Sequence, residues 1–254
     1  MDINLTFMGA ARGVTGSRNL IEANGITLLV DCGLYQEHEF LHRNWEPFRC
    51  QPSELTAVLL THAHLDHSGL LPKLVNEGFQ GRVICTPATA DITKIMLLDA
   101  AQVQEEDAEY KKKRHIREGR KGPYPKIPLY TVKDAEASLK FFSPVEYNTP
   151  VDIGSGITAT FHDAGHVLGS SMIKVVVSQK GEKRSIVFSG DIGRRDRPFL
   201  HDPDTFRRTD YVVMESTYGD KAHRGAETIG DELAKIVKST TTAGGNIIVP
   251  SFAL

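Results

Sequence analysis

A short segment in the first quarter of the chain concentrates side chains that bind metal ions. After the apolar run at residues 55–60 come His62, His64, Asp66 and His67. In an extended segment, side chains two residues apart point the same way, so His62, His64 and Asp66 would face one side and His67 another. This spacing can divide the ligands between two neighbouring metal ions. The alternative is a histidine-rich loop in solvent.

Two further candidate ligands, His166 and Asp191, each follow a predicted strand. Either residue alone would be read more simply as part of a turn, because Gly-His and Gly-Asp turns are common. Imidazole and carboxylate groups suit Zn²⁺, with Mn²⁺ or Fe²⁺ as alternatives, and no cysteine lies near them to favour a softer metal. The sequence therefore predicts a zinc site, provided that the fold brings these residues to the histidine-rich segment.

The composition is that of an ordinary soluble protein rather than a membrane or disulfide-rich protein. The 254 residues are 40% hydrophobic and 24% charged, enough for a substantial core, and the net charge of -2 excludes a strongly basic overall surface. The start has no cationic and apolar leader, and no apolar run is long enough to cross a membrane, so we predict a cytoplasmic protein. The cysteines Cys32, Cys50 and Cys85 are widely spaced, so we expect them to be reduced and structural.

Strands and helices alternate along the chain, which indicates layered α/β packing. From hydrophobic periodicity and turn residues, the predicted strands cover residues 3–8, 17–23, 26–30, 57–60, 82–85, 142–153, 157–162, 172–177, 184–188, 211–214 and 246–250. The predicted helices cover residues 69–77, 87–117, 134–139 and 227–239. Asp31 ends the third strand before a glycine turn, where a carboxylate is more often a turn former than a site residue.

A basic stretch at residues 111–126 holds eight Lys and Arg residues against one Glu. Its two glycines and two prolines predict a loop. Such a charge run is usually a solvated surface. The alternative is a flap that contacts phosphates, since clustered cations gain affinity for nucleic acid by releasing counterions. The candidate contacts are Lys111, Lys112, Lys113 and Arg114.

Together, the histidine-rich segment, His166 and Asp191 resemble, in order and surroundings, the metal-binding motifs of the metallo-β-lactamase superfamily. Asp31 matches the first motif of that family. The resemblance implies that His62, His64 and His166 hold one metal ion. It further implies that Asp66 and His67 hold a second ion, that Asp191 bridges both, and that Asp31 supports the ligands without binding metal.

A finer resemblance points to the β-CASP branch of this superfamily, which contains nucleases acting on RNA or DNA. The segments that carry it are residues 9–17, 215–220, 244–245 and 249–254. The branch includes bacterial and archaeal relatives of the endonuclease that processes pre-mRNA 3′ ends. The resemblance implies an α/β fold, with a metallo-β-lactamase αββα sandwich over residues 1–214 and the first part of a β-CASP domain over residues 215–254.

Members of the branch supply two further histidines from the far side of the β-CASP domain. One completes the second metal site, and the other pairs with the glutamate equivalent to Glu215. Neither histidine has a counterpart in these 254 residues, so we expect a truncated β-CASP domain and weak binding of the second metal ion.

The predicted function is zinc-dependent hydrolysis of phosphodiester bonds in RNA, single-stranded RNA being favoured. Two metal ions would lower the pKa of a bridging water and activate it as the attacking hydroxide. By the resemblance, Asp66 orients this nucleophile and Glu215 holds the general acid. The alternatives are a thioester hydrolase or lactonase, a DNA-directed nuclease and a non-catalytic scaffold. No membrane partner is expected, and a homodimer is compatible with the sequence.

Overall fold

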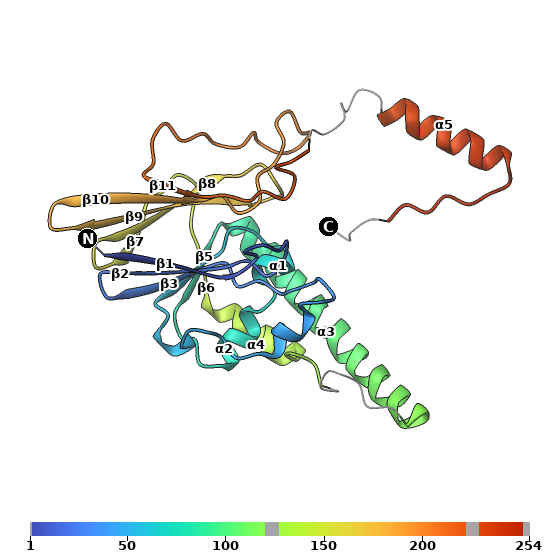
Figure 1. Ribbon diagram of the computed structural model, residues 1–254, viewed down its shortest axis with the longest axis horizontal. Helices are drawn as coiled ribbons and strands as arrows, with labels where there is room; N and C mark the ends of the chain where they lie inside the picture. The colour runs from blue at the N-terminus through green and yellow to red at the C-terminus, as the bar shows by residue number, and fades with distance from the viewer. Residues whose placement is uncertain (1, 120–126, 222–228, 251–254) are drawn as a thin grey trace. The chain divides into compact units, whose positions relative to one another are not determined.

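The computed structural model describes residues 2–119, 127–221 and 229–250. The chain divides into two compact units, Met1–Glu215 and Ser216–Leu254. The first unit contains two β-sheets and the helices that cover one of them (Figure 1). The second unit contains helix α5, Ile229–Thr242.

The first sheet has its strands in chain order, β1-β2-β3-β4-β5-β6. The strands are β1 (Ile3–Gly9), β2 (Arg18–Ala23), β3 (Ile26–Val30), β4 (Ala57–Leu59), β5 (Arg82–Cys85) and β6 (Phe142–Pro144). The first three strands are antiparallel, with a tight turn between β2 and β3 and a longer connection over residues 10–17 between β1 and β2, whereas β3 to β6 run parallel. The carboxyl ends of β3 and β4 therefore meet at one edge of the sheet, where loops commonly carry site residues.

The second sheet has the order β11-β10-β9-β8-β7. Its strands are β7 (Val151–Gly154), β8 (Ile157–Asp163), β9 (Ser171–Gln179), β10 (Glu182–Phe188) and β11 (Tyr211–Val213). Neighbouring strands are antiparallel except for the parallel pair β10 and β11. Strands β8 and β10 both flank β9 in the antiparallel sense, so their carboxyl ends also share one edge.

The two sheets pack face to face through alternating apolar side chains. On β8, Ile157, Ala159 and Phe161 are buried while the residues between them are partly exposed, as the two-residue period of a strand requires. They join one apolar cluster with residues of the first sheet, among them Ile21 and Leu28. This shared core fixes the two sheets relative to each other, as in a β-sandwich.

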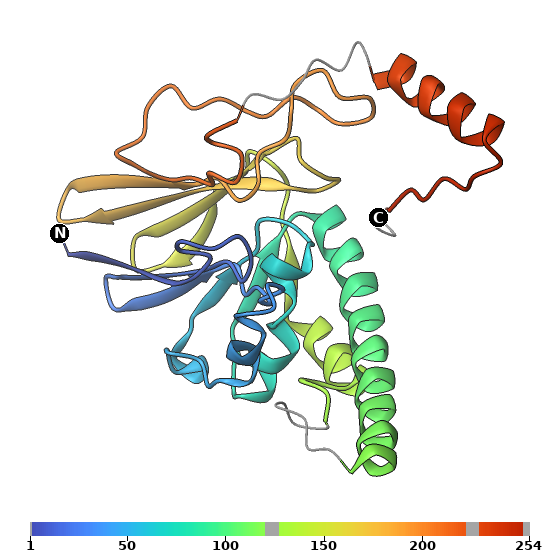
Figure 2. The same ribbon diagram turned by 45° about the vertical axis from the view of Figure 1, so that its right-hand side comes forward.

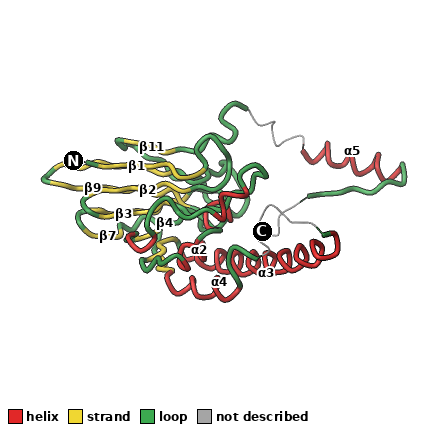
Figure 3. Tube along the Cα trace, turned by 60° about the horizontal axis from the view of Figure 1, so that its bottom comes forward, coloured by secondary structure: helices red, strands yellow, loops and turns green. Residues whose placement is uncertain are grey.

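Helices cover the other face of the first sheet (Figure 2). They are α1 (Leu65–Ser68), α2 (Leu71–Asn76), α3 (Pro87–Glu118) and α4 (Val132–Ser138), with 3-10 helices at Leu41–Trp45, Pro52–Glu54 and Leu139–Phe141. Helix α3 begins at Pro87, where the Thr86 side chain accepts a hydrogen bond from the Thr89 amide, and ends at Gly119, whose φ of 63° suits glycine. Figure 3 shows α2, α3 and α4 grouped together beside the strands.

The predicted α/β class and most of the predicted elements are confirmed. The single strand predicted over residues 142–153 is wrong, because the structure divides it into β6 and β7, which belong to different sheets. The helix predicted over residues 87–117 is confirmed, so the loop predicted over the overlapping residues 111–126 is wrong for 111–118, while 120–126 lie outside the described residues. Residues 111–118 contain no proline or glycine, so nothing ends the helix before Gly119.

In the second unit, α5 has the amphipathic pattern that the sequence predicts, but its apolar side chains Ile229, Leu233, Ile236 and Val237 are exposed. The strand predicted over residues 246–250 is wrong, since none is formed there. A strand needs a hydrogen-bonded partner, and the described part of this unit offers none. In the described ranges, no helix has the length and apolar character needed to cross a membrane.

The connection between β1 and β2 is held by one carboxylate. Residues Ala10, Arg12 and Gly16 have positive φ angles of 54°, 66° and 83°. Glu37 accepts hydrogen bonds from the Val14 amide, 2.7 Å, and from the amide and hydroxyl of Thr15. Burial opposes ionisation of Glu37, but these hydrogen bonds outweigh it and lower the pKa to about 2.

Replacing Glu37 with Gln should therefore destabilise the protein at neutral pH. The pKa of Glu37 is depressed in the folded state, so its contribution is fully present above the unfolded-state value of about 4.5 and is lost as the pH falls toward 2. We expect a melting temperature about 2–4 °C lower than the wild type at pH 7, with a smaller difference at pH 3. Thermal melts of Glu37→Gln and of the control Glu39→Gln measure this, and a difference that does not depend on pH would contradict it.

Candidate metal centre

The candidate ligands and the supporting residue Asp31 come from the carboxyl ends of four strands in both sheets. Asp31 follows β3, the histidine-rich segment follows β4, His166 follows β8 and Asp191 follows β10. The backbone of Thr61 binds the start of β9, with 2.8 Å between the Ser171 amide nitrogen and the Thr61 carbonyl oxygen. The two sheets thus meet directly beside the ligands.

Four of these residues form a compact group, since the ligand atoms of His62, His64, His166 and Asp191 all lie within 4.8 Å of one another. His64 Nδ1 is 3.1 Å from His62 Nε2 and 3.3 Å from His166 Nε2. Asp191 Oδ2 is 3.7 Å from His62 Nε2 and 3.6 Å from His166 Nε2. A tetrahedral zinc ion with bonds of about 2.0–2.1 Å has ligand atoms about 3.3–3.4 Å apart, so this donor set fits zinc.

A second group begins at the other oxygen of the same aspartate. Asp191 Oδ1 lies 3.2 Å from His67 Nε2, and Asp66 Oδ2 lies 3.8 Å from that nitrogen. Asp191 therefore presents one carboxylate oxygen to each group. The extended conformation predicted for the whole motif is wrong beyond His64, because Leu65–Ser68 forms the helical turn α1. The turn brings Asp66 and His67 together on the second group.

Asp31 lies behind the ligands and orients two of them. Its carboxylate is 2% exposed and accepts hydrogen bonds from the amide and hydroxyl of Thr61, at 2.8 and 2.9 Å from Oδ1. Asp31 Oδ2 is 2.7 Å from His67 Nδ1, which leaves His67 Nε2 free to bind metal. The Thr61 hydroxyl oxygen is also 3.0 Å from His62 Nδ1, so it orients the ring whose Nε2 belongs to the first group.

Short polar contacts fix the loops that carry His166 and Asp191. The Ser170 hydroxyl accepts a hydrogen bond from the His166 amide, 3.0 Å. Glu215 Oε1 accepts one from the Ile192 amide, 2.8 Å, directly after Asp191. Gly190 has a φ of +52°, and a Cβ atom there would lie 2.8 Å from the Thr61 side chain, so a larger residue would displace Asp191.

Burial and neighbouring charges shift the pKa values of the ligands in opposite directions. Burial, together with the other histidines, lowers the pKa of His62 well below 6.5, and burial beside His166 also lowers that of His64. For His67, burial also favours the neutral form, but Asp31 and Asp191 outweigh it and raise the pKa well above 6.5. The rings of His62 and His64 are therefore neutral and ready for metal, whereas a metal ion at the second group must displace a proton from His67.

The structure brings all six predicted ligand residues together and puts Asp31 behind them. Glu215 contacts the loop after Asp191 rather than the ligand atoms themselves. The sequence did not predict the supporting roles of Thr61 and Ser170, whose hydroxyl groups contact His62 and the His166 amide. Thr61 directly precedes His62 in the sequence, and Ser170 follows His166 by four residues, so their positions could have indicated these roles.

Three cations of the basic stretch that lie within α3 are paired with acids. Lys111, Lys113 and Arg114 form ion pairs with the acids four residues away, Asp107, Glu109 and Glu118. These pairs favour the solvated-surface alternative for this stretch.

The match to a known family agrees with this arrangement. A model described as the metallo-beta-lactamase superfamily domain matches residues 20–215. The chain belongs to the metallo-β-lactamase superfamily. The matched range holds every ligand of both groups as well as Asp31 and Glu215, and so the superfamily domain includes the whole candidate centre.

Similar proteins are named for RNA processing and transcription. The chain is 40% identical to "Ribonuclease TTHA0252" of Thermus thermophilus over 97% of its own length and 51% of the relative. It is 32% identical to "Transcription termination factor FttA" of Methanocaldococcus jannaschii, over 99% of the chain and 37% of the relative. It is 29% identical to "Endoribonuclease YSH1" of Eremothecium gossypii, over 97% of the chain and 30% of the relative. The chain thus spans about half or less of the length of these relatives, and the resemblance to the β-CASP branch is confirmed.

Removing two imidazoles of the first group should abolish tight metal binding, because only His166 and Asp191 would remain. We expect His62→Ala combined with His64→Ala to lower the zinc content of the purified protein at least about tenfold. Elemental analysis after dialysis measures this. His38→Ala combined with His42→Ala, at two exposed histidines, is the control. Equal zinc uptake by all three proteins would show that this group is not the metal site.

Metal binding at the second group should depend on pH more steeply than at the first. His67 carries a proton at neutral pH in the metal-free protein, because its pKa is raised, whereas the lowered pKa values of His62 and His64 leave those rings neutral. We expect roughly one tightly bound zinc ion per chain at pH 6 and a second one at pH 8. Zinc titration calorimetry in two buffers measures stoichiometry and proton release. Identical stoichiometry at both pH values would contradict this assignment.

Proposed function

We propose that this chain is the catalytic part of a zinc-dependent ribonuclease that hydrolyses RNA phosphodiester bonds with two metal ions. The main support is that Asp191 offers one carboxylate oxygen to each of two adjacent ligand groups. Its Oδ1 lies 3.2 Å from His67 Nε2, and its Oδ2 lies 3.6 Å from His166 Nε2. A shared carboxylate is the arrangement expected for two ions about 3.5–4 Å apart. The proposed ligands are His62, His64, His166 and Asp191 for the first ion and Asp66, His67 and Asp191 for the second.

When bound, two such ions would activate the attacking water and neutralise charge on the phosphate. The chain's own residues hold that geometry. Thr61 and Asp31 orient the rings of His62 and His67, and Glu215 fixes the backbone beside Asp191. We assign Asp66 the role of orienting the nucleophile, since its carboxylate lies at the second group, 3.8 Å from His67 Nε2. The prediction that Glu215 also holds a general acid stays a prediction.

RNA is favoured as the substrate by the relatives, of which two are named as ribonucleases. A thioester hydrolase or lactonase would use the same ligands but would not account for these relatives. A scaffold would be expected to have lost ligands, whereas all six ligand positions available in these 254 residues are filled. We further propose that the RNA substrate is single-stranded, that the protein is cytoplasmic and that it can form a homodimer.

Residues 215–254 are proposed to be the first part of a β-CASP domain. The exposed apolar side chains of α5 support this, because an amphipathic helix ordinarily buries its apolar face against other elements. The second group has three protein ligands and the first has four, so we propose that the second ion binds more weakly in this chain.

Replacing Asp66 with Asn should separate catalysis from binding. The substitution keeps the shape of the side chain but removes the charge that positions the nucleophile, so we expect RNA cleavage to fall at least about a hundredfold. RNA affinity and the melting temperature should stay near the wild-type values. Cleavage of a labelled single-stranded RNA and of a matched DNA, with zinc-loaded protein, measures the effect and the substrate preference. Full activity in Asp66→Asn would remove this role, and cleavage of DNA alone would overturn RNA as the substrate.

A further inference from the structure

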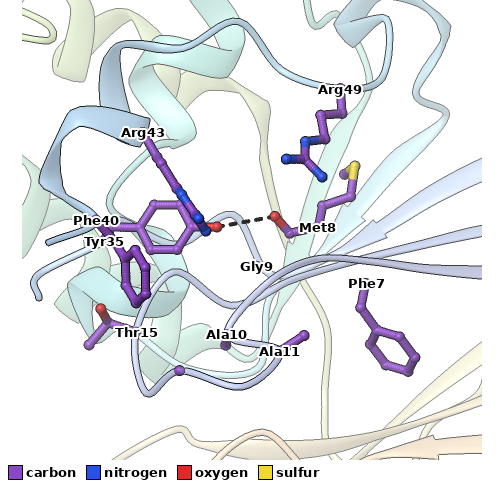
Figure 4. Close-up of a pocket in the computed structure, with 11 residues that line it drawn as sticks. Phe7, Met8, Gly9, Ala10, Ala11, Thr15, Tyr35, Phe40, Arg43 and Arg49 are labelled. Atoms are coloured by element: carbon purple, nitrogen blue, oxygen red, sulfur yellow. Dashed lines mark hydrogen bonds between the residues drawn. The ribbon is translucent and has the colours of Figure 1, made fainter.

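A cavity of about 140 Å³ lies between the β1–β2 connection and the segment that follows β3 (Figure 4). Arg43 and Arg49 line it together with the backbone of residues 9–11. None of its lining residues is acidic, and the nearby Glu37 carboxylate is already engaged by the amides of Val14 and Thr15 and by the Thr15 hydroxyl. In Figure 4 both arginine side chains extend toward Met8 and Tyr35, and the Tyr35 hydroxyl donates a 3.2 Å hydrogen bond to the Met8 carbonyl.

A third arginine is buried beside this cavity without an acidic partner. Arg18 is 8% exposed and lines a smaller adjoining hollow together with Arg43 and Arg49. Its guanidinium carbon lies 4.9 Å from the ring centre of Tyr35 and 5.9 Å from that of Phe48. Its Nε atom is buried and has no hydrogen-bond partner. Among the residues that the structure describes, no carboxylate lies within ion-pair distance of it.

A buried guanidinium without a counter-ion is unfavourable, so it creates a strong preference for an anion nearby. The one acid at the smaller hollow is Glu46, which is exposed and lies 3.7 Å from His42. The ring of Phe40 supports Arg43, with 4.5 Å from the guanidinium carbon to the ring centre, and so limits its freedom. Planar guanidinium groups held in this way suit the paired oxygens of a phosphate.

The β1–β2 connection, which lines the cavity, also contacts the backbone of the candidate metal centre. The β1–β2 connection ends at Ser17, whose amide donates a 2.8 Å hydrogen bond to the Asp66 carbonyl. Gly33 packs so closely there that a Cβ atom would lie 1.6 Å from that carbonyl oxygen. An anion in the cavity would therefore be held on the same rigid backbone as the proposed catalytic aspartate.

We propose that Arg18, Arg43 and Arg49 form a phosphate-binding site that holds one backbone phosphate of the RNA strand beside the metal centre. The inference rests on the proposed ribonuclease function. Held there, the phosphate fixes the path of the strand while the scissile phosphate lies at the metal ligands. The site reads the charge and shape of a phosphate and not the base sequence.

The test compares RNA binding by two charge-matched double variants. Arg43→Gln with Arg49→Gln removes two cations from the cavity. Arg82→Gln with Arg184→Gln removes two exposed cations at the starts of β5 and β10, the ends of those strands away from the ligands. Both pairs are made in zinc-loaded Asp66→Asn protein, so that a fluorescent single-stranded RNA stays intact, and affinity is followed by anisotropy over a range of salt concentrations.

For the cavity pair we expect the Kd to rise about tenfold and the salt slope to fall by about 0.7, the value for one lost phosphate contact on a single strand. The control pair should stay within about twofold of the parent, with an unchanged slope. Arg49→Gln alone, which leaves the ring-stacked Arg43 in place, should give a smaller loss in the same direction. Unchanged binding and slope in the cavity pair, or equal losses in both pairs, would overturn the site.

A second readout separates this inference from the proposed function. The small diester bis(4-nitrophenyl) phosphate reaches only the metal ligands, so its hydrolysis by the cavity pair in an otherwise wild-type chain should equal that of the wild type. If the wild type takes up no zinc and hydrolyses neither ester nor RNA, the proposed function itself fails. If zinc uptake and ester hydrolysis persist while the cavity pair binds RNA like its parent, only the phosphate site is lost.

Discussion

The buried carboxylate of Asp31 is the group on which the geometry of the centre depends. Its backbone has a φ of 63°, an unfavourable region for most residues that aspartate tolerates better. A carboxylate that is 2% exposed would be strongly destabilising without partners, and here Thr61 and His67 supply them. Thr61 in turn contacts the ring of His62, and His67 presents its Nε2 atom to the second ligand group. One buried charge thus sets the tautomer and the direction of rings on both sides of Asp191.

The candidate ligands could be picked out from the sequence because their chemistry is local. Three histidines and an aspartate within six residues point to metal whatever the fold, and a glycine beside His166 or Asp191 marks a turn at a strand end. The family resemblance then connected the distant positions. Among the strands that carry them, β8 shows the two-residue alternation plainly, whereas β4 and β10 end in short runs of buried residues.

The parts that could not be predicted depend on pairing between distant segments. Whether residues 142–153 form one strand or two is decided by which sheet each half joins, and hydrophobicity alone does not encode that choice. The turn at Leu65–Ser68 replaces an extended segment because its backbone is held by Ser17, Cys32 and Leu34 from other elements. Likewise Arg18 gives no signal in the sequence, since only burial between Tyr35 and Phe48 distinguishes it from an ordinary strand arginine.

The origin of the first ligand group in two different sheets has a mechanical consequence. His62 and His64 follow a strand of the first sheet, whereas His166 and Asp191 follow strands of the second. An ion bound by all four would act as a cross-link between the halves of the sandwich, at the edge where the apolar core ends. Because the unfolded chain does not hold these groups together, the free energy of binding adds to the stability of the folded state. The bound metal ion would then stabilise the packing of the two sheets as well as take part in the chemistry. The stability of the folded protein would therefore depend on the concentration of available metal.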